Sequence, residues 1–245
     1  MPESVHREIW EYLRPVEIFC KLSRASRIMD DAITVSKVAT RQHIHLKCWT
    51  KGMSTLYRVE CLLRSVRWRE CTHLKMDIAR GFQFNGENRG KPFSSSLRSL
   101  HIEILSYGSH DILDAVLHSF SSVVDLVLIG RQRTTPKMLK MVATRLPQLQ
   151  TLTLRKCKNG SFGLRGQDFQ CFRELTSLHL SEVDHSLHID CHEEALMGLP
   201  QSLKELRIHT KFGQSSAAYQ LLRRQITRCQ DAMPSVLIEL RPRYW

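Results

Sequence analysis

The feature that most constrains this chain is a short apolar pattern, L-x-x-L-x-L, that recurs along most of its length. Clear copies lie at positions 97/100/102, 123/126/128, 149/152/154, 175/178/180 and 203/206/208, with a weaker copy at 71/74/76 and apolar pairs at 44/46 and 238/240. The middle apolar position recurs at residues 44, 74, 100, 126, 152, 178, 206 and 240, so the spacings are 30, 26, 26, 26, 26, 28 and 34. Four equal spacings indicate an internal repeat, which is typical of proteins built by stacking similar units.

Each copy of the pattern predicts a short β-strand. Apolar residues two positions apart, such as Leu152 and Leu154, point to one face of a strand while their neighbours point to the other. A single strand cannot bury that face alone, whereas successive strands stacked in parallel share one core. Between the strands, apolar residues at helical spacing predict helices over residues 111–120, 136–146 and 215–229, and a Gly-, Asn- and Ser-rich stretch predicts an irregular return over residues 79–96.

These elements predict an α/β fold, a curved solenoid with eight parallel strands inside and helices and irregular returns outside. Residues 71–208 resemble leucine-rich repeats of the strand-plus-helix kind found in intracellular recognition proteins. The resemblance implies that the outward-facing side chains of the strands form a concave binding surface.

This surface is the candidate site for a target protein. With strands about 4.8 Å apart, its area is on the order of 450 Å², below the roughly 800 Å² that each partner contributes to a standard interface. The loops after the strands are therefore expected to contribute, and they contain Tyr107 and Arg131, residue types favoured at binding hot spots. The candidate target-binding residues are His45, Lys75, His101, Glu103, Tyr107, Arg131, Thr153, Arg155, His179 and Arg207.

The excess of positive charge does not lie on this surface. The chain has 36 Lys and Arg against 24 Asp and Glu, a net charge of +12, but the outward positions of the predicted strands carry five cations and five carboxylates. A basic protein admits nucleic acid as a partner. However, the chain has no RNA-recognition, KH or zinc-finger pattern, and aromatic residues make up only 7% of it. We therefore expect a protein partner and no direct recognition of nucleic acid.

Motifs for catalysis, cofactors and metal ions are missing. The chain has no G-x-S-x-G, P-loop, H-E-x-x-H or G-x-G-x-x-G, so we expect neither enzymatic activity nor a cofactor. Nothing in the sequence supports activation of Cys157 or Cys171 as a nucleophile. The cluster of His188, Cys191 and His192 lacks a second ligand pair at metal-binding spacing, so we expect no metal site.

The expected location is intracellular, in the cytoplasm or the nucleus. No apolar run is long enough to span a membrane, and charged residues stand where a signal peptide would have its apolar run. The eight cysteines are widely spaced, which favours reduced thiols over a disulfide framework.

Residues 1–40 lack the strand repeat and predict three short helices. Val5, Ile9 and Leu13 fall on one face of the first helix, which ends before Pro15. The segment resembles the F-box, whose succession of residues is matched by Pro2, Ile9, Leu13, Pro15, Glu17, Leu22, Ser26 and Arg27. Two departures from that pattern are Met1 in place of the usual Leu and the absence of the Trp that follows Ser-Arg. An F-box segment (residues 1–40) followed by a leucine-rich-repeat domain (residues 41–245) is a recognised family arrangement.

The resemblance implies a substrate-recognition subunit of an SCF-type (cullin-RING) E3 ubiquitin ligase. Its F-box would bind a Skp-type adaptor, and its repeats would hold a target protein near the recruited conjugating enzyme. The candidate adaptor-binding residues are Pro2, Val5, Ile9, Leu13, Ile18 and Leu22. The alternative is a stand-alone leucine-rich-repeat scaffold in which the same helices cap the first repeat.

Overall fold

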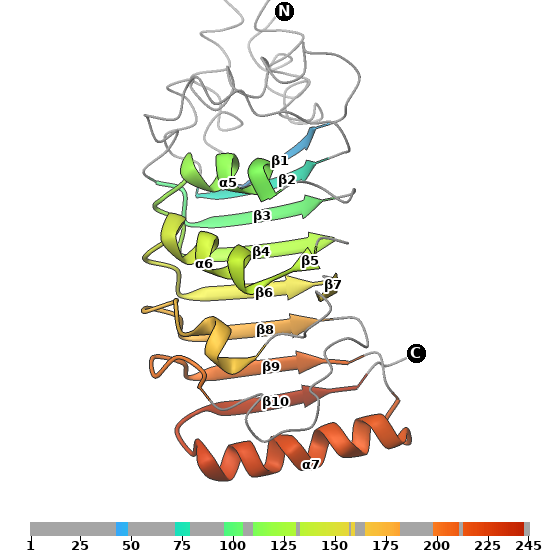
Figure 1. Cartoon of the computed structure of the whole chain (residues 1–245). Helices are drawn as coiled ribbons and strands as arrows, with labels where there is room; N and C mark the ends of the chain where they lie inside the picture. Colours follow the sequence, from blue (N-terminus) through green and yellow to red (C-terminus); the bar gives the residue numbers. More distant parts are fainter. Residues whose placement is uncertain are drawn as a thin grey trace, which may run out of the picture.

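A computed structural model describes residues 43–48, 72–78, 96–104, 110–130, 133–156, 158–159, 165–181, 198–210 and 213–242. Its main element is an eight-stranded sheet in which all neighbouring strands are parallel (Figure 1). The strands follow one another across the sheet in chain order: β1 (His43–Cys48), β2 (His73–Ile78), β3 (Ser99–Ile104), β4 (Asp125–Gly130), β6 (Thr151–Arg155), β8 (Ser177–Ser181), β9 (Glu205–His209) and β10 (Leu237–Arg241). The predicted α/β class with a parallel sheet is confirmed.

The register of the sheet aligns the equivalent apolar positions of successive repeats. Leu100 pairs with Leu126 and Leu126 with Leu152, and this alignment continues through Leu178 to Leu206. At the last step the prediction was wrong by two residues, because Leu206 pairs with Ile238 rather than Leu240. Ile238 and Leu240 both face the same side of a strand, so the sequence pattern alone fits either register.

The same backbone hydrogen bonds join each repeat to the one before it. The amides of Val124 and Asp125 both donate to the carbonyl of Arg98, at 2.9 and 3.0 Å. One repeat later, the amides of Gln150 and Thr151 both donate to the carbonyl of Val124, at 2.8 and 2.9 Å. Equivalent pairs of amides occur at residues 98/99, 176/177 and 204/205. Each strand is therefore placed by the turn that precedes it.

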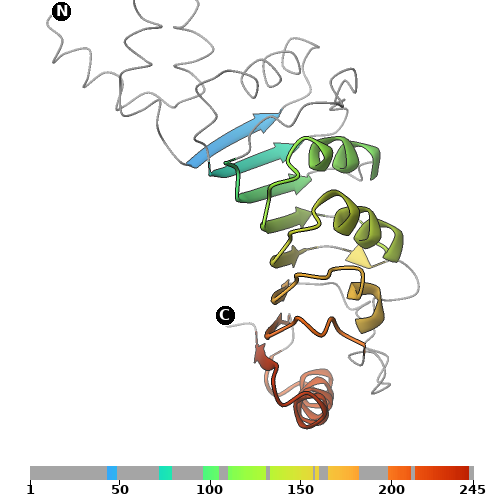
Figure 2. The same ribbon diagram turned by 90° about the vertical axis from the view of Figure 1, so that its left-hand side faces the viewer.

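The core lies between the sheet and the returns that follow the strands. The middle leucines at positions 100, 126, 152, 178 and 206 are fully buried. The helices α5 (His110–His118) and α6 (Pro136–Arg145) and the 3-10 helix η4 (Gly166–Phe169) all lie on one side of the sheet (Figure 2). Figure 2 also shows the strands arranged along a gentle bend, with the helices on its outer side.

The returns match the predicted helices closely, and their starts follow the usual capping rules. Thr135 caps α6, since its Oγ1 accepts the amide of Met138 at 3.2 Å, and Pro136 occupies the first turn. Ser216 caps α7 (Ala217–Ala232) through the amide of Tyr219 at the same distance. The helices predicted over residues 111–120, 136–146 and 215–229 are thus confirmed, with ends that differ by at most three residues.

Some elements were not predicted, and some predictions lie outside the described residues. The strands β5 (Arg133–Thr134) and β7 (Lys158–Asn159) form a second, two-stranded parallel sheet, and they are too short to show a sequence period. The helical segment over residues 1–40 and most of the irregular return over residues 79–96 fall outside the described residues.

A side chain of α7 occupies the open edge of β10. Nε2 of Gln230 donates to the carbonyl of Val236 at 2.7 Å, and its Oε1 accepts the amide of Ile238 at 3.1 Å. A residue of a further parallel strand would make the same two bonds through its own peptide groups. The side-chain amide of Gln230 therefore takes the place of one residue of a next strand and covers the start of this edge.

Replacing this amide should unpair the edge. We expect Gln230→Ala to lower the free energy of unfolding by about 1–2 kcal/mol, because the Val236 carbonyl and the Ile238 amide lose their partner. Hydrogen exchange followed by NMR should show faster exchange of the Ile238 amide. The Leu237 amide, which donates to Lys204 at 2.8 Å on the inner side, should stay protected.

The control for this prediction is Gln220→Ala, a substitution of an exposed residue on the same helix that should leave the Ile238 amide unchanged. Unchanged exchange at Ile238 in Gln230→Ala would contradict the role given to the side chain.

Candidate functional site

The candidate site is the face of the sheet opposite α5, α6 and η4. Along β2, β3, β4, β6, β8 and β9, buried residues alternate with more exposed ones, so every second side chain points away from the core. These outward positions are the odd-numbered residues of β2, β3, β4, β6, β8, β9 and β10, and we call them the open face. The prediction that the residues between the leucines point outward is confirmed for these strands.

Seven of the ten residues proposed to bind a target lie on the open face: Lys75, His101, Glu103, Thr153, Arg155, His179 and Arg207. His45 occupies the register position beside Lys75 in β1. Tyr107 and Arg131 lie outside the described residues, as do the adaptor-binding candidates Pro2, Val5, Ile9, Leu13, Ile18 and Leu22.

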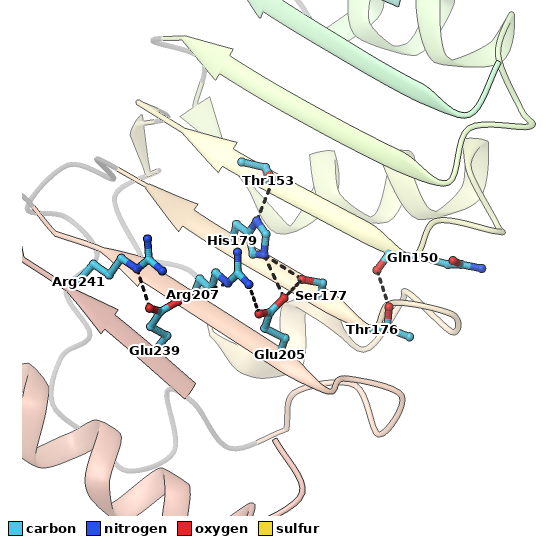
Figure 3. A network of polar contacts seen from close by, with 9 residues as sticks. All are labelled: Gln150, Thr153, Thr176, Ser177, His179, Glu205, Arg207, Glu239 and Arg241. Carbon is cyan, nitrogen blue, oxygen red and sulfur yellow. Dashed lines mark hydrogen bonds and ion pairs between the residues drawn. The ribbon is translucent and has the colours of Figure 1, made fainter. Parts of the chain in front are cut away.

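A chain of polar contacts crosses the open face from β6 to β9 (Figure 3). Nδ1 of His179 lies 3.4 Å from Oγ1 of Thr153, and its Nε2 lies 2.9 Å from Oγ of Ser177. Ser177 donates to Oε2 of Glu205 at 2.7 Å. Each partner comes from the same strand or the next, because the parallel register places equivalent side chains side by side.

The chain of contacts continues through alternating charges to β10 (Figure 3). Arg207 contacts the second carboxylate oxygen of Glu205 at 2.5 Å, and its Nε lies 3.4 Å from Glu239. Arg241 donates to the other oxygen of Glu239 at 2.6 Å. Two arginines and two carboxylates therefore neutralise one another. The half of the open face on β6, β8, β9 and β10 thus presents paired charges to solvent.

These contacts shift the pKa values of the acidic groups. The hydrogen bond from Ser177, helped by His179 and Arg207, holds the pKa of Glu205 below its ordinary value of 4.5. The hydrogen bond from Arg241 lowers the pKa of Glu239 in the same way. Burial, together with the charge of Arg241, lowers the pKa of His209 below 6.5. At neutral pH both carboxylates are therefore ionised and His209 is uncharged.

Ser177, His179 and Glu205 are the residue types of a nucleophilic triad, but their geometry differs from one. In a triad the hydroxyl and the carboxylate contact opposite nitrogens of the imidazole. Here both lie near the same nitrogen, Nε2, at 2.9 and 3.4 Å, and the hydroxyl donates its proton to the carboxylate. The three residues therefore form a polar cluster whose geometry is not that of a catalytic triad.

The other half of the open face is acidic. Nζ of Lys75 lies 3.7 Å from Asp77 and 3.8 Å from Glu103, so one cation faces two carboxylates. Asp125 adds a third carboxylate, whose Oδ2 accepts a hydrogen bond from Ser99 at 2.8 Å. Counting histidines as neutral, the open-face residues of β2, β3 and β4 carry a net charge of −2.

An apolar centre separates the two halves, and the predicted set of target-binding residues missed it. Val127 and Ile129 of β4 point outward and are only partly buried. The signal is present in the sequence, since residues 126–129 are an unbroken apolar run where β2, β3, β6, β8 and β9 alternate. Partly exposed aliphatic side chains surrounded by polar ones are typical of the centre of a protein interface.

Cys171 and Cys229 are free thiols that are partly and fully buried, respectively. Burial raises the pKa of the Cys171 thiol, which donates to the carbonyl of Asp168 at 3.4 Å, and Cys229 is buried. Cys171 therefore lacks the lowered pKa of a nucleophilic cysteine. Cys157 and the cluster of His188, Cys191 and His192 fall outside the described residues.

The described part of the chain contains no group of three or more His, Cys, Asp or Glu side chains arranged to hold a metal ion. Within the same ranges, no helix has the length and apolar character needed to cross a bilayer. Grooves of about 530 Å³ beside α7 and β10 and about 330 Å³ between α6 and residues 171–173 lie away from the open face.

No known protein family and no curated protein matches this chain. Function is therefore inferred from its own residues. The open face combines an apolar centre, an acidic half and a half with paired charges on a backbone that the repeat hydrogen bonds hold in place. Such an arrangement can bind another protein without reorganising its own side chains.

The lowered pKa of Glu205 predicts how stability depends on pH. Because the folded pKa lies below the unfolded one, this carboxylate stabilises the fold above about pH 4.5, and that stability is lost as the pH falls through the folded value. We expect Glu205→Gln to lower the free energy of unfolding by about 1–2 kcal/mol at pH 7. The further loss between pH 5 and 3, measured by urea denaturation, should be smaller than in the wild type.

Glu174→Gln is the matched control, since Glu174 is exposed just before β8 and off the open face. If the free energy of unfolding of Glu205→Gln fell between pH 5 and 3 by as much as that of the wild type, this role for Glu205 would be ruled out.

Proposed function

We propose that this protein is a recognition subunit that binds a partner protein through the open face, and that its repeats form a leucine-rich-repeat solenoid. The 26-residue period, the parallel strands in chain order and the helices on one side of the sheet support the solenoid. A rigid stack of this kind presents side chains at fixed spacings over an extended surface.

The observation that carries the proposal is the position of Val127 and Ile129. They lie on β4, fourth of the eight strands, with Asp125 on their own strand and polar residues such as Thr153 on the next. Burying partly exposed aliphatic groups supplies affinity, whereas the paired charges around them supply orientation. Mixed and largely neutralised charge favours a protein over nucleic acid, whose phosphates require a cationic surface.

We extend the proposal to residues 1–40, which resemble the F-box. This segment would bind a Skp-type adaptor of an SCF-type cullin-RING ubiquitin ligase, and the open face would hold the target. The protein itself would carry out no chemistry. It would act by proximity, because tethering raises the effective concentration of target lysines near the ubiquitin-bearing enzyme.

The adaptor half is tested with purified components. The full chain should bind a Skp-type adaptor in isothermal titration calorimetry, and the double substitution Ile9→Asp/Leu13→Asp should weaken binding at least tenfold, because two carboxylates would be buried in an apolar contact. The circular-dichroism spectrum should be unchanged. A chain without residues 1–40 should lose the adaptor and keep its target. If that deletion instead destabilises the repeats and the full chain does not bind the adaptor, the segment is a cap.

The target half is tested by affinity purification of the tagged full chain from cells. Val127→Asp should remove proteins that bind the open face, since it places a charge in the apolar centre. Ser121→Asp is the matched control, because it adds the same charge at an exposed position before β4. Retention of every co-purifying protein by Val127→Asp would refute recognition through this face.

A further inference from the structure

The charges of the open face are ordered across the strands. The register places the last outward residues of β2, β3, β4 and β6 side by side as Asp77, Glu103, Ile129 and Arg155. Two acids, an aliphatic side chain and a base thus follow one another in a row perpendicular to the strands. Within this part of the row the sign of the charge changes across β4, and beyond Asp77 the next register position is Lys47 of β1.

The row sets the charge of the two halves of the face, because the remaining charged residues on each side cancel. The acidic half on β2, β3 and β4 has one cation, Lys75, for three carboxylates. The half on β6, β8, β9 and β10 has three arginines and two carboxylates, because Arg155 adds to the two Arg–Glu pairs of Figure 3, and His209 is uncharged at neutral pH. The net charges are therefore −2 and +1, with Val127 and Ile129 between them.

The spacing of the row indicates the shape of the complementary segment. Neighbouring strands are about 4.8 Å apart, so β3 and β6, on either side of β4, are about 9.6 Å apart. In an α-helix, residues i, i+4 and i+7 lie on one face at about 6 and 10.5 Å along the axis. Along an extended segment, side chains on one face recur every 6.6 Å or so, which places the second and third of them about 6.6 and 13 Å from the first. The i to i+7 distance of a helix therefore matches the separation of Glu103 and Arg155 better than an extended segment does.

We propose that the open face binds an α-helix of its partner protein, laid across β3, β4 and β6, with a basic, an apolar and an acidic side chain on successive turns. The basic group contacts Glu103, the apolar group packs on Ile129 and Val127, and the acidic group contacts Arg155. This inference rests on the proposed function and names the chemistry of the partner's contact segment.

The test uses three stapled, fluorescein-labelled helical peptides of neutral background. They carry Lys/Leu/Glu, Lys/Leu/Lys or Glu/Leu/Glu at positions i, i+4 and i+7. Fluorescence anisotropy with the full chain should show at least tenfold tighter binding of the Lys/Leu/Glu peptide. A peptide with the two charges exchanged is not used, because it could bind in the reverse direction and place the same charges at the same sites.

Substitutions on the protein should then change the preference in a defined way. Glu103→Lys should shift it to the Glu/Leu/Glu peptide, Arg155→Glu should shift it to the Lys/Leu/Lys peptide, and Ile129→Ser should weaken all three at least tenfold. Glu174→Lys and Arg173→Glu are matched controls with the same charge changes at exposed positions off the open face. Glu103→Gln, which adds no new charge beside Lys75, should abolish the preference over the Glu/Leu/Glu peptide and keep the preference over the Lys/Leu/Lys peptide, which depends on Arg155.

Equal binding of the three peptides, or binding of none, would overturn the inference. A wild-type preference for the Glu/Leu/Glu peptide would do so too, by identifying an anion-binding surface. Dimerisation of the full chain that is lost in Ile129→Ser, seen by size-exclusion chromatography with light scattering, would assign the face to a second copy instead. If the peptides fail while Val127→Asp still removes a cellular partner, the helix is wrong and recognition through the open face stands.

Discussion

The hydrogen bonds from each pre-strand turn to the carbonyl one repeat earlier are the constraint on which the rest of the structure depends. They set the register of each strand, and in a parallel sheet a slip of one residue would exchange the buried and the outward faces. The pair of amides before each strand shares one acceptor, such as the carbonyl of Arg98 for Val124 and Asp125. This fixes which residues of β4 are buried, Leu126 and Leu128, and which face outward, Val127 and Ile129. The core and the open face are two consequences of the same backbone geometry.

Regular register also explains the polar character of the open face. Side chains at equivalent positions stand next to one another, so a hydroxyl on one strand meets a carboxylate on the next, as in Ser99 with Asp125 and Ser177 with Glu205. The ion pairs of Lys75 with Glu103 and of Arg207 with Glu205 neutralise much of the charge within the face and leave it little net attraction for a highly charged ligand. Affinity must then come from burying the apolar groups on β4, with the charges on either side selecting the orientation of the partner.

Much of this was predictable from the sequence, because a two-residue alternation within a 26-residue period has one simple solution in three dimensions. The parallel order of strands, the outward direction of residues such as Lys75 and His179, and the helices α5, α6 and α7 all follow from it. The register of β10 did not, since Ile238 and Leu240 fit the pattern equally well and the packing at the end of the sheet decides between them. The pattern also places Val127 and Ile129 outward, but the residue types favoured at binding hot spots are aromatic and charged, so the predicted site did not include this aliphatic pair.

The sequence by itself determined which residues face the core and which face away, because that choice depends only on the spacing of apolar residues along the chain. Only the tertiary structure decided which outward residues meet. The contact of His179 with both Thr153 and Glu205 joins residues from three strands, and the hydrogen bonds of Gln230 at the start of β10 join a helix to a strand edge. Such contacts depend on distances between strands and on side-chain direction, and a linear period contains neither.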